Sequence, residues 1–166
     1  MTSWYFAYGS NLNTDRLYEA RLKPRGCWMG RRLAARLDGW ELKFNIPSPA
    51  WVGAGVGNMQ QNDAETVWGT INEMDEKGLD VLDIYEQVKE GMYKRITVSV
   101  FCPQLDKTVE AVAYVGVCKL DDSLIPSKDY LCHFLVGRDV LPAEYIKKLE
   151  EIKTLDVVAD PYALQK

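Results

Sequence analysis

Apolar and polar residues alternate along much of the chain, and this two-residue period is typical of strands with one buried face. In residues 93–101, for example, Val98 and Val100 fall on the same face as Ile96. Alternation or aromatic content predicts strands at residues 4–8, 66–74, 93–101 and 109–117. The last two are expected to pair across a polar turn at 103–107.

Two glycine-containing regions are harder to interpret. Residues 28–44 predict a strand, a tight turn at Asp38-Gly39 and a second strand. Residues 46–63 are rich in glycine and proline, which predicts a loop with one short strand around 54–59. The glycines in this loop do not form G-x-G-x-x-G, because Asn58 or Gln60 stands where the last glycine is required.

Apolar residues spaced three and four apart predict helices between the strands. These helices cover residues 14–21 with Thr14 as N-cap, 75–86 with Asp75 as N-cap, 129–136, and a last helix that opens at Leu141-Pro142 with the apolar stripe Tyr145, Leu149 and Ile152. Residues after Leu155 give weak signals and are expected to lie on the surface. The sum is a single α+β domain over residues 1–166 with more strand than helix.

Composition excludes several classes of function. A net charge of −4 and a pI near 5.1 give no basic surface for nucleic acid. No apolar run reaches the roughly 18 residues that a membrane helix requires. The first six residues do not look like a signal peptide. These features predict a cytoplasmic protein that binds neither nucleic acid nor membrane.

Cysteine and histidine narrow the chemistry further. The spacing of Cys27, Cys102, Cys118 and Cys132 matches no zinc pattern and predicts reduced, mostly packed thiols. His133 is the only histidine, so one chain cannot build a multi-histidine metal site or more than one histidine-dependent triad. Cys132 and His133 are neighbours on a predicted helix and point about 100° apart, which argues against a dyad.

The turn after the first strand is the first candidate for binding chemistry. Its sequence, Y-G-S-N-L, joins a buried strand to a helix, and such a turn directs several backbone N–H groups into one space. These groups can bind a carboxylate or a developing oxyanion, and an ordinary helix-capping turn is the structural alternative. The run does not match the G-x-S-x-G nucleophile elbow. The candidate residues are Tyr8, Gly9, Ser10, Asn11 and Leu12.

Glu86 is the second candidate. Its spacing from Leu79 and Leu82 puts it on the buried face of the predicted helix. Burial raises the pKa of a carboxylic acid, as a general base near neutral pH requires. The alternative is a partly exposed carboxylate or one paired with Lys89, Lys94 or Arg95. Several tyrosines could also present hydroxyls to a ligand, and the sequence does not choose among Tyr8, Tyr85, Tyr93, Tyr114, Tyr130 and Tyr145.

The Y-G-S-N-L run after an aromatic strand resembles the signature of the γ-glutamylcyclotransferase family. The similarity continues in order through V-W-G at 67–69, the segment 82–93 that would carry the catalytic glutamate, Tyr130 and the segment 137–145. It covers about residues 4–149. Departures from the common pattern are Ile84-Tyr85 before the glutamate and Gln87 after it, where glycine is common.

The resemblance implies a small β-barrel-like fold with peripheral helices and a pocket at one end. It implies Glu86 as the base, residues 8–12 as the cradle of a γ-glutamyl group, and Tyr130 as a substrate contact. It implies no metal or organic cofactor, and a monomer or homodimer. The expected product is 5-oxoproline. The alternatives are a γ-glutamylamine or specialised γ-glutamyl intermediate as substrate, decided by residues 46–63, a ligand-binding relative without turnover, or a Ser or Cys hydrolase.

Overall fold

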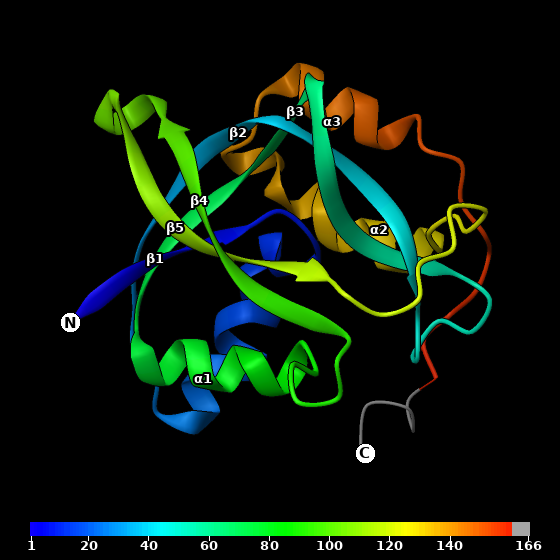
Figure 1. The fold of residues 1–166 in the computed structure, drawn as a ribbon, viewed down its shortest axis with the longest axis horizontal. Coiled ribbons are helices and arrows are strands. Elements are labelled where there is room, and N and C mark those ends of the chain that lie inside the picture. The colour runs from blue at the N-terminus through cyan, green and yellow to red at the C-terminus, as the bar shows by residue number, and fades with distance from the viewer. Residues whose placement is uncertain (161–166) are drawn as a thin grey trace.

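The computed structural model describes residues 1–160 of the 166-residue chain. Strands and helices of this part are shown in Figure 1. Their bounds are β1 Thr2–Ala7, β2 Met29–Pro47, β3 Gly55–Asp75, β4 Tyr93–Cys102, β5 Lys107–Gly116, α1 Glu76–Tyr85, α2 Lys128–Leu135 and α3 Ala143–Glu150. Shorter helical segments are the 3₁₀ turns Ser10–Leu12, Lys23–Arg25, Pro103–Leu105 and Val136–Asp139 and the π-helix Asp15–Leu22.

The strands close into a barrel in the order β1-β3-β2-β4-β5. The long strands β2 and β3 pair antiparallel, and β4 pairs antiparallel with β5 as predicted. A parallel contact between Tyr5 and Val112 closes the barrel between β1 and β5. Phe6, Ile71 and Val100 are fully buried and belong to one hydrophobic cluster of barrel residues. The predicted α+β, barrel-like fold is confirmed.

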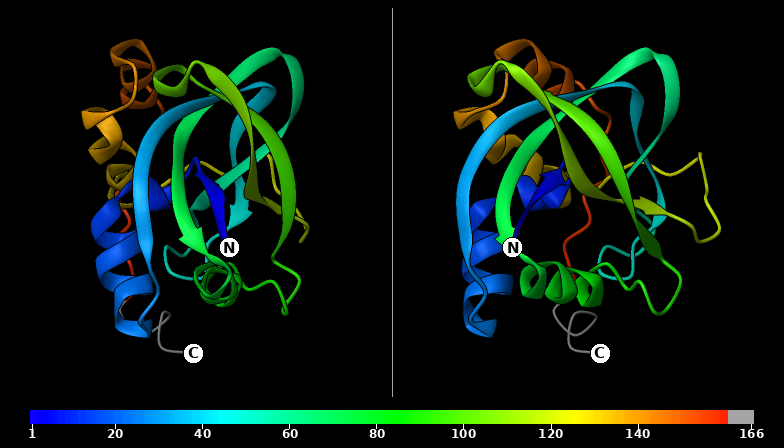
Figure 2. Two further views of the ribbon diagram at one scale, coloured as in Figure 1. Left: turned by 90° about the vertical axis from the view of Figure 1, so that its left-hand side faces the viewer. Right: turned by 60° about the vertical axis from the view of Figure 1, so that its left-hand side comes forward.

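The helices cover only part of the barrel. Figure 2 shows the π-helix, α2 and α3 along one side and α1 across the lower end. Their apolar faces form a second hydrophobic cluster with residues such as Leu17, Leu82 and Phe134. The barrel therefore has one end and one side framed by helices. No helix within residues 1–160 is long and apolar enough to cross a membrane.

The predicted turn at Asp38-Gly39 was wrong, because β2 runs through it without reversing. The pairing with β3 shifts register between Asp38 and Trp40, and Gly39 has a φ of 80°. Glycine supplies positive φ to turns and to β-bulges alike. Local composition therefore cannot separate the two, and the continuous partner strand decides in favour of a bulge.

The predicted loop over residues 46–63 was largely wrong as well. β3 begins at Gly55, so only 48–54 is irregular. A Cβ atom on Gly55 would lie 1.7 Å from the Phe44 carbonyl oxygen, which explains glycine inside a strand. The glycines were correctly associated with close backbone approach, but that approach occurs between paired strands.

The predicted helix over 14–21 exists, but it is wound as a π-helix. The Lys23 N–H donates to the carbonyl of Tyr18, five residues earlier. The predicted cap was wrong: Thr14 has helical backbone angles, whereas an N-cap residue is usually extended. The Asn13 side chain accepts the Asp15 N–H instead, at 3.1 Å.

The other helices agree with their predictions. Asp75 caps α1 by accepting the Gly78 N–H at 2.8 Å. The predicted 129–136 helix is α2. Pro142 directly precedes α3, whose buried residues are Ile146 and Leu149, while the remaining predicted stripe residues, Tyr145 and Ile152, are half-buried. All four cysteines are free: Cys27 and Cys102 are buried, Cys118 is half-buried and Cys132 is exposed.

Residues 156–160 are irregular, as expected, yet they make defined contacts. The Asp160 N–H donates to the carbonyl of Ala50 at 2.8 Å, and the Ala159 N–H donates to Asp129 at 3.3 Å. These bonds tie the end of the described chain to the 48–54 loop and to α2. The rest of the predicted surface tail, 161–166, lies outside the described residues.

Candidate active site

Two adjoining pockets lie where the barrel meets the 3₁₀ turn, the π-helix and α2. The first, here called the tyrosine pocket, encloses about 330 Å³ and is lined by Tyr5, Tyr8, Gly9, Ser10, Asn11, Gly57, Glu86, Tyr93, Tyr114 and Tyr130. The second, here called the arginine pocket, encloses about 570 Å³ and is lined by Ser10, Arg16, Arg21, Ser48, Pro49, Ala50, Trp51, Val56, Tyr85, Glu86, Gln87, Met92, Tyr93 and Tyr130. Because Ser10, Glu86, Tyr93 and Tyr130 line both, the two pockets form one continuous site.

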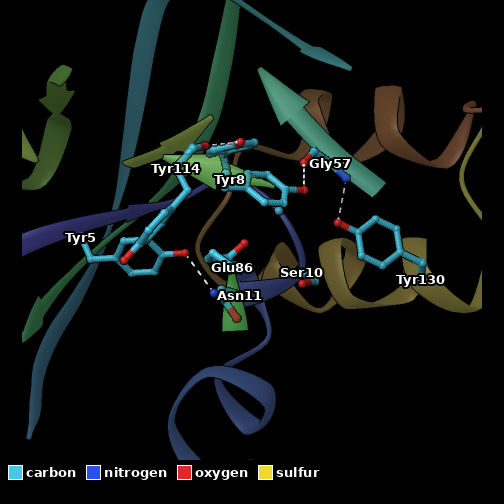
Figure 3. Close-up of a pocket in the computed structure, with 10 residues that line it drawn as sticks. Tyr5, Tyr8, Ser10, Asn11, Gly57, Glu86, Tyr114 and Tyr130 are labelled. Carbon is cyan, nitrogen blue, oxygen red and sulfur yellow. Dashed lines mark hydrogen bonds between the residues drawn. The ribbon is translucent and has the colours of Figure 1, made fainter. Parts of the chain in front are cut away.

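Glu86 occupies the boundary between the two pockets. It is the residue at which α1 ends, and its N–H donates to the Leu82 carbonyl at 2.8 Å. The Val88 N–H then donates to Asp83 and the Gln87 N–H to Ile84, the bonds of a Schellman motif. This C-terminal cap fixes the Glu86 backbone. Figure 3 shows its carboxylate pointing into the space between the surrounding tyrosines.

The environment of Glu86 changes its acidity. Its side chain is 18% exposed, and burial raises its pKa above the ordinary value of 4.5. Arg21, with Nη1 3.7 Å from Oε1, opposes that rise and Arg16 opposes it more weakly. The alternative pairing with Lys89, Lys94 or Arg95 does not occur; Arg95 instead pairs with acidic residues of α1.

A chain of hydrogen bonds connects Glu86's partner to the barrel. Arg21 Nη1 donates to Asn11 Oδ1 at 2.9 Å, and Asn11 Nδ2 donates to the Tyr5 hydroxyl at 2.9 Å. The Arg21 guanidinium also lies over the Tyr85 ring, 4.6 Å from its centroid. Each side chain therefore has one defined orientation, which pre-organises the site around the Glu86 carboxylate.

The turn over residues 8–12 places most of its members in the tyrosine pocket, as predicted. Leu12 is the first residue of the turn whose N–H bonds within it, to Gly9, so the N–H groups of Ser10 and Asn11 precede the first bonded position. Leu12 itself is fully buried and lines neither pocket. Its position in the core is a structural role rather than a contact with a ligand.

Tyr130 and Tyr93 approach the pocket from α2 and β4 and meet at one residue of β3. The Gly57 N–H donates to the Tyr130 hydroxyl at 2.9 Å, and the Tyr93 hydroxyl donates to the Gly57 carbonyl at 2.7 Å. A Cβ atom on Gly57 would lie 3.2 Å from Phe134 and from the Tyr130 hydroxyl. Glycine at this position therefore keeps the pocket open.

The phenols of the tyrosine pocket are neutral at physiological pH. Burial raises the pKa of Tyr130 to about 12, and it raises those of Tyr5 and Tyr8 further. They can therefore supply hydrogen bonds but not charge. Within residues 1–160, Glu86 is the only carboxylate that lines either pocket, and Arg16 and Arg21 are the only cations.

The single histidine lies outside both pockets. His133 Nδ1 and Asn13 Nδ2 are 3.0 Å apart, and burial lowers the pKa of His133 to about 4, so its ring is neutral near pH 7. The prediction of a packing residue rather than a dyad member agrees with this position. In the described chain, no group of three or more His, Cys, Asp or Glu side chains is arranged to hold a metal ion.

Comparison with known proteins places this site in a family. The model of the AIG2-like family matches residues 66–149. A bovine protein named gamma-glutamylcyclotransferase is 34% identical over 158 residues, which cover 92% of this chain and 79% of the bovine protein. The human protein of the same name gives the same identity and coverage. The chain belongs to the γ-glutamylcyclotransferase family.

A solved structure supports the same assignment for this cyclotransferase-family chain. The structure named gamma-glutamyl cyclotransferase superposes with a TM-score of 0.84 at 29% identity, covering 99% of this chain and 97% of that one. The agreement extends over the whole barrel and its helices.

Sequence reasoning missed several residues of the site in this family member. Tyr5 was assigned only to a buried strand, although the two-residue period could have put it on the same face as Ala7. Arg16 and Arg21 were not singled out, because an α-helical period puts them on different faces. Trp51 was noted only as part of a loop. Their arrival in one site depends on the π-helix and on how the 48–54 loop folds back.

Proposed function

We propose that this chain is a γ-glutamylcyclotransferase that converts a γ-glutamyl amino acid or peptide into 5-oxoproline and a free amine. The observation that carries the proposal is the position of Glu86. Its carboxylate is held at the boundary of two pockets, and burial keeps its pKa above the ordinary value. The bovine and human relatives that bear the name of this activity align with nearly the whole chain.

The tyrosine pocket suits the γ-glutamyl group. Its volume of about 330 Å³ lies at the lower end of the range for small-ligand sites, roughly 300–1,000 Å³. Glu86 is the only negative charge in its described lining and attracts the substrate's ammonium group. The N–H groups of Ser10 and Asn11 are available to the substrate carboxylate or to the oxyanion formed during attack.

The reaction is an internal aminolysis. The α-amino nitrogen attacks the γ-carbonyl carbon, a C–N bond closes the five-membered lactam, and the bond from that carbon to the leaving nitrogen breaks. Glu86 accepts protons from the attacking nitrogen and passes them to the leaving nitrogen. The two protons lost by the ammonium group are those gained by the departing amine, so Glu86 ends the cycle unchanged.

Much of the rate enhancement would come from holding the substrate folded. Well-oriented internal reactions reach effective molarities of roughly 10⁵ M or more. The fixed orientations of Arg21, Asn11 and Tyr5 preserve the shape of the pocket against which the substrate must fold. Proton transfer by Glu86 adds about 10²–10⁴-fold.

No nucleophilic side chain is needed for this chemistry. The Ser10 hydroxyl accepts a hydrogen bond from Arg16 Nε at 3.1 Å, and no histidine lines either pocket in the described chain. A Ser or Cys hydrolase would instead be acylated by an active-site-directed probe. We expect no labelling of Ser10 or of the exposed Cys132.

The deciding experiment measures release of 5-oxoproline by mass spectrometry from γ-glutamyl dipeptides, glutathione and γ-glutamylamines. Wild type is compared with Glu86→Gln and with Glu90→Gln, a matched change at an exposed glutamate four residues further on. We expect turnover in wild type and Glu90→Gln and its near-complete loss in Glu86→Gln. Absence of turnover on every compound would favour a ligand-binding protein without catalysis.

We further propose that the protein works in the cytoplasm on small molecules, as a monomer or homodimer, without nucleic acid. Its net charge of −4 disfavours association with phosphate backbones. Sedimentation and a nucleic-acid retention assay test these points. A larger assembly or retained nucleic acid would contradict them.

A further inference from the structure

The π-helix brings two cations into one pocket. Arg16 and Arg21 are five residues apart, and both line the arginine pocket. In an α-helix, residues five apart point about 140° away from each other. The i→i+5 bonding of the π-helix places such residues nearly above one another, and it is frequent at functional sites. The unusual winding therefore has a direct consequence for the charge of this pocket.

The two guanidinium groups differ in their partners. Arg21 is engaged by Glu86, Asn11 and the Tyr85 ring. Arg16 donates Nε–H to the Ser10 hydroxyl and lies 5.8 Å from the centroid of the Trp51 ring, yet it forms no ion pair with any residue in 1–160. A partly buried cation with only neutral partners is costly to retain unless an anion joins it.

The acidic groups nearby do not neutralise Arg16. Glu86 is paired with Arg21, and Asp129 Oδ2 accepts the indole N–H of Trp51 at 2.6 Å. With Glu86 ionised, the lining of the arginine pocket carries a net charge of +1 from its two arginines and one carboxylate. Burial lowers the pKa of Arg16 to about 10, so it stays cationic at neutral pH. An occupant with one negative charge would balance the pocket.

The opposite wall of the pocket is apolar and firmly held. Trp51 is 4% exposed, and its ring lies 5.0 Å from that of Tyr130. The Ser48 hydroxyl accepts the N–H groups of both Ala50 and Trp51. The tail adds the bond from Asp160 to Ala50. This wall can accommodate an amino-acid side chain while the arginine side takes a charge.

We propose that Arg16 is a specificity-determining residue that binds the α-carboxylate of the leaving amino acid in the arginine pocket. This rests on the proposed function. In a γ-glutamyl amino acid, that carboxylate is attached to the carbon next to the leaving nitrogen. A carboxylate so close to the reacting amide must lie near the pocket boundary. Arg16 reaches this boundary through Ser10, which lines both pockets.

The proposal separates two substrate classes that differ by one group. γ-Glutamylalanine and γ-glutamylethylamine share the glutamyl group and an alkyl leaving group, but only the former carries the second carboxylate. We expect wild type to favour γ-glutamylalanine by roughly 10- to 100-fold in kcat/KM, because a charge-assisted hydrogen bond is lost with the amine. Similar values for both compounds would overturn the proposal while leaving the proposed function intact.

Variants of Arg16 assign the preference to this side chain. Arg16→Gln is expected to lower kcat/KM for γ-glutamylalanine by roughly 10- to 100-fold, mainly through KM, and to change that for γ-glutamylethylamine less than about 3-fold. Arg16→Lys should restore part of the preference. Arg25→Gln, at an exposed arginine, serves as the control and should behave as wild type.

Each outcome bears on the proposal. Equal losses for both substrates in Arg16→Gln would mean that Arg16 only positions Ser10, and the proposal would fail. If wild type releases 5-oxoproline from neither compound, the proposed function fails and this inference falls with it. If Arg16→Gln does not fold, as judged by circular dichroism, the wild-type preference and Arg16→Lys still decide.

Discussion

The two halves of the site are built in different ways. The tyrosine pocket is lined largely by barrel strands, and its phenols are joined to backbone groups such as those of Gly57. The arginine pocket is lined by the π-helix, the 48–54 loop and the end of α1, and it contains a cation without an ion pair in the described chain. We infer that the barrel half handles the invariant γ-glutamyl group, whereas the irregular half selects the leaving group.

The largest expected effect comes from removing the group that both halves share. Glu86→Gln should lower kcat by about 10²–10⁴-fold for γ-glutamylalanine and γ-glutamylethylamine alike, because every substrate needs its proton moved. Steady-state kinetics on both compounds measure it, with Glu90→Gln as control. A loss confined to one compound would contradict the division between common and selective halves.

A smaller effect is expected from the barrel half alone. Tyr130→Phe leaves the buried Gly57 N–H without its acceptor, which costs about 1–3 kcal/mol. The free energy of unfolding from urea titration should fall by that amount, whereas Tyr18→Phe, at a half-buried tyrosine outside both pockets, should change it little. If the two variants lose equal stability, the Gly57 bond is not an important part of the pocket.

The pH dependence tests the electrostatics at the boundary. Glu86 acts only when ionised, and burial raises its pKa above 4.5. Activity should therefore fall as the pH drops through this raised pKa. Arg21→Gln removes the cation 3.7 Å away that favours the ionised form, so the acid limb of kcat/KM should move to higher pH.

Arg25→Gln provides the control for that shift, because Arg25 is exposed and lines neither pocket. Its acid limb should coincide with that of wild type. A shift to lower pH in Arg21→Gln would show that Arg21 does not stabilise the Glu86 carboxylate.

The smallest effect concerns the cap that holds Glu86. Gln87 has a φ of 52°, a left-handed conformation that favours glycine by about 1 kcal/mol. Gln87→Gly should therefore raise the free energy of unfolding by about 1 kcal/mol. Gly91→Ala is the matched inverse, since Gly91 has a φ of 73° and open space around its Cα, and it should lower stability by a similar amount. Changes of the same sign would contradict the backbone explanation.

Strong local signals explain which parts of the fold could be predicted from the sequence. The alternation of β4 and β5 and the Asp75 cap of α1 depend on neighbours in the chain, and they were predicted correctly. The bulge at Gly39 and the start of β3 at Gly55 depend on a partner strand, so local composition was ambiguous there.

The same distinction applies to the site. Glu86 was found because helical spacing from Leu79 and Leu82 predicts a buried face, and the motif at 8–12 supplied the resemblance. Tyr5 and Gly57 were missed because strands carry no signal that tells a pocket-lining position from a core position. The roles of Leu12 and Tyr85 likewise depend on which side of the barrel they reach.

The sequence by itself determined the strand pattern, the helix that carries Glu86, the absence of a histidine-based triad and the family resemblance. These follow from periodicity, composition and local motifs. Only the tertiary structure decided that Arg21 rather than Lys89 faces Glu86, and that Arg16 stands beside it without an ion pair in residues 1–160. The physical reason is that a π-helix and a closed barrel bring together residues whose proximity no local period encodes.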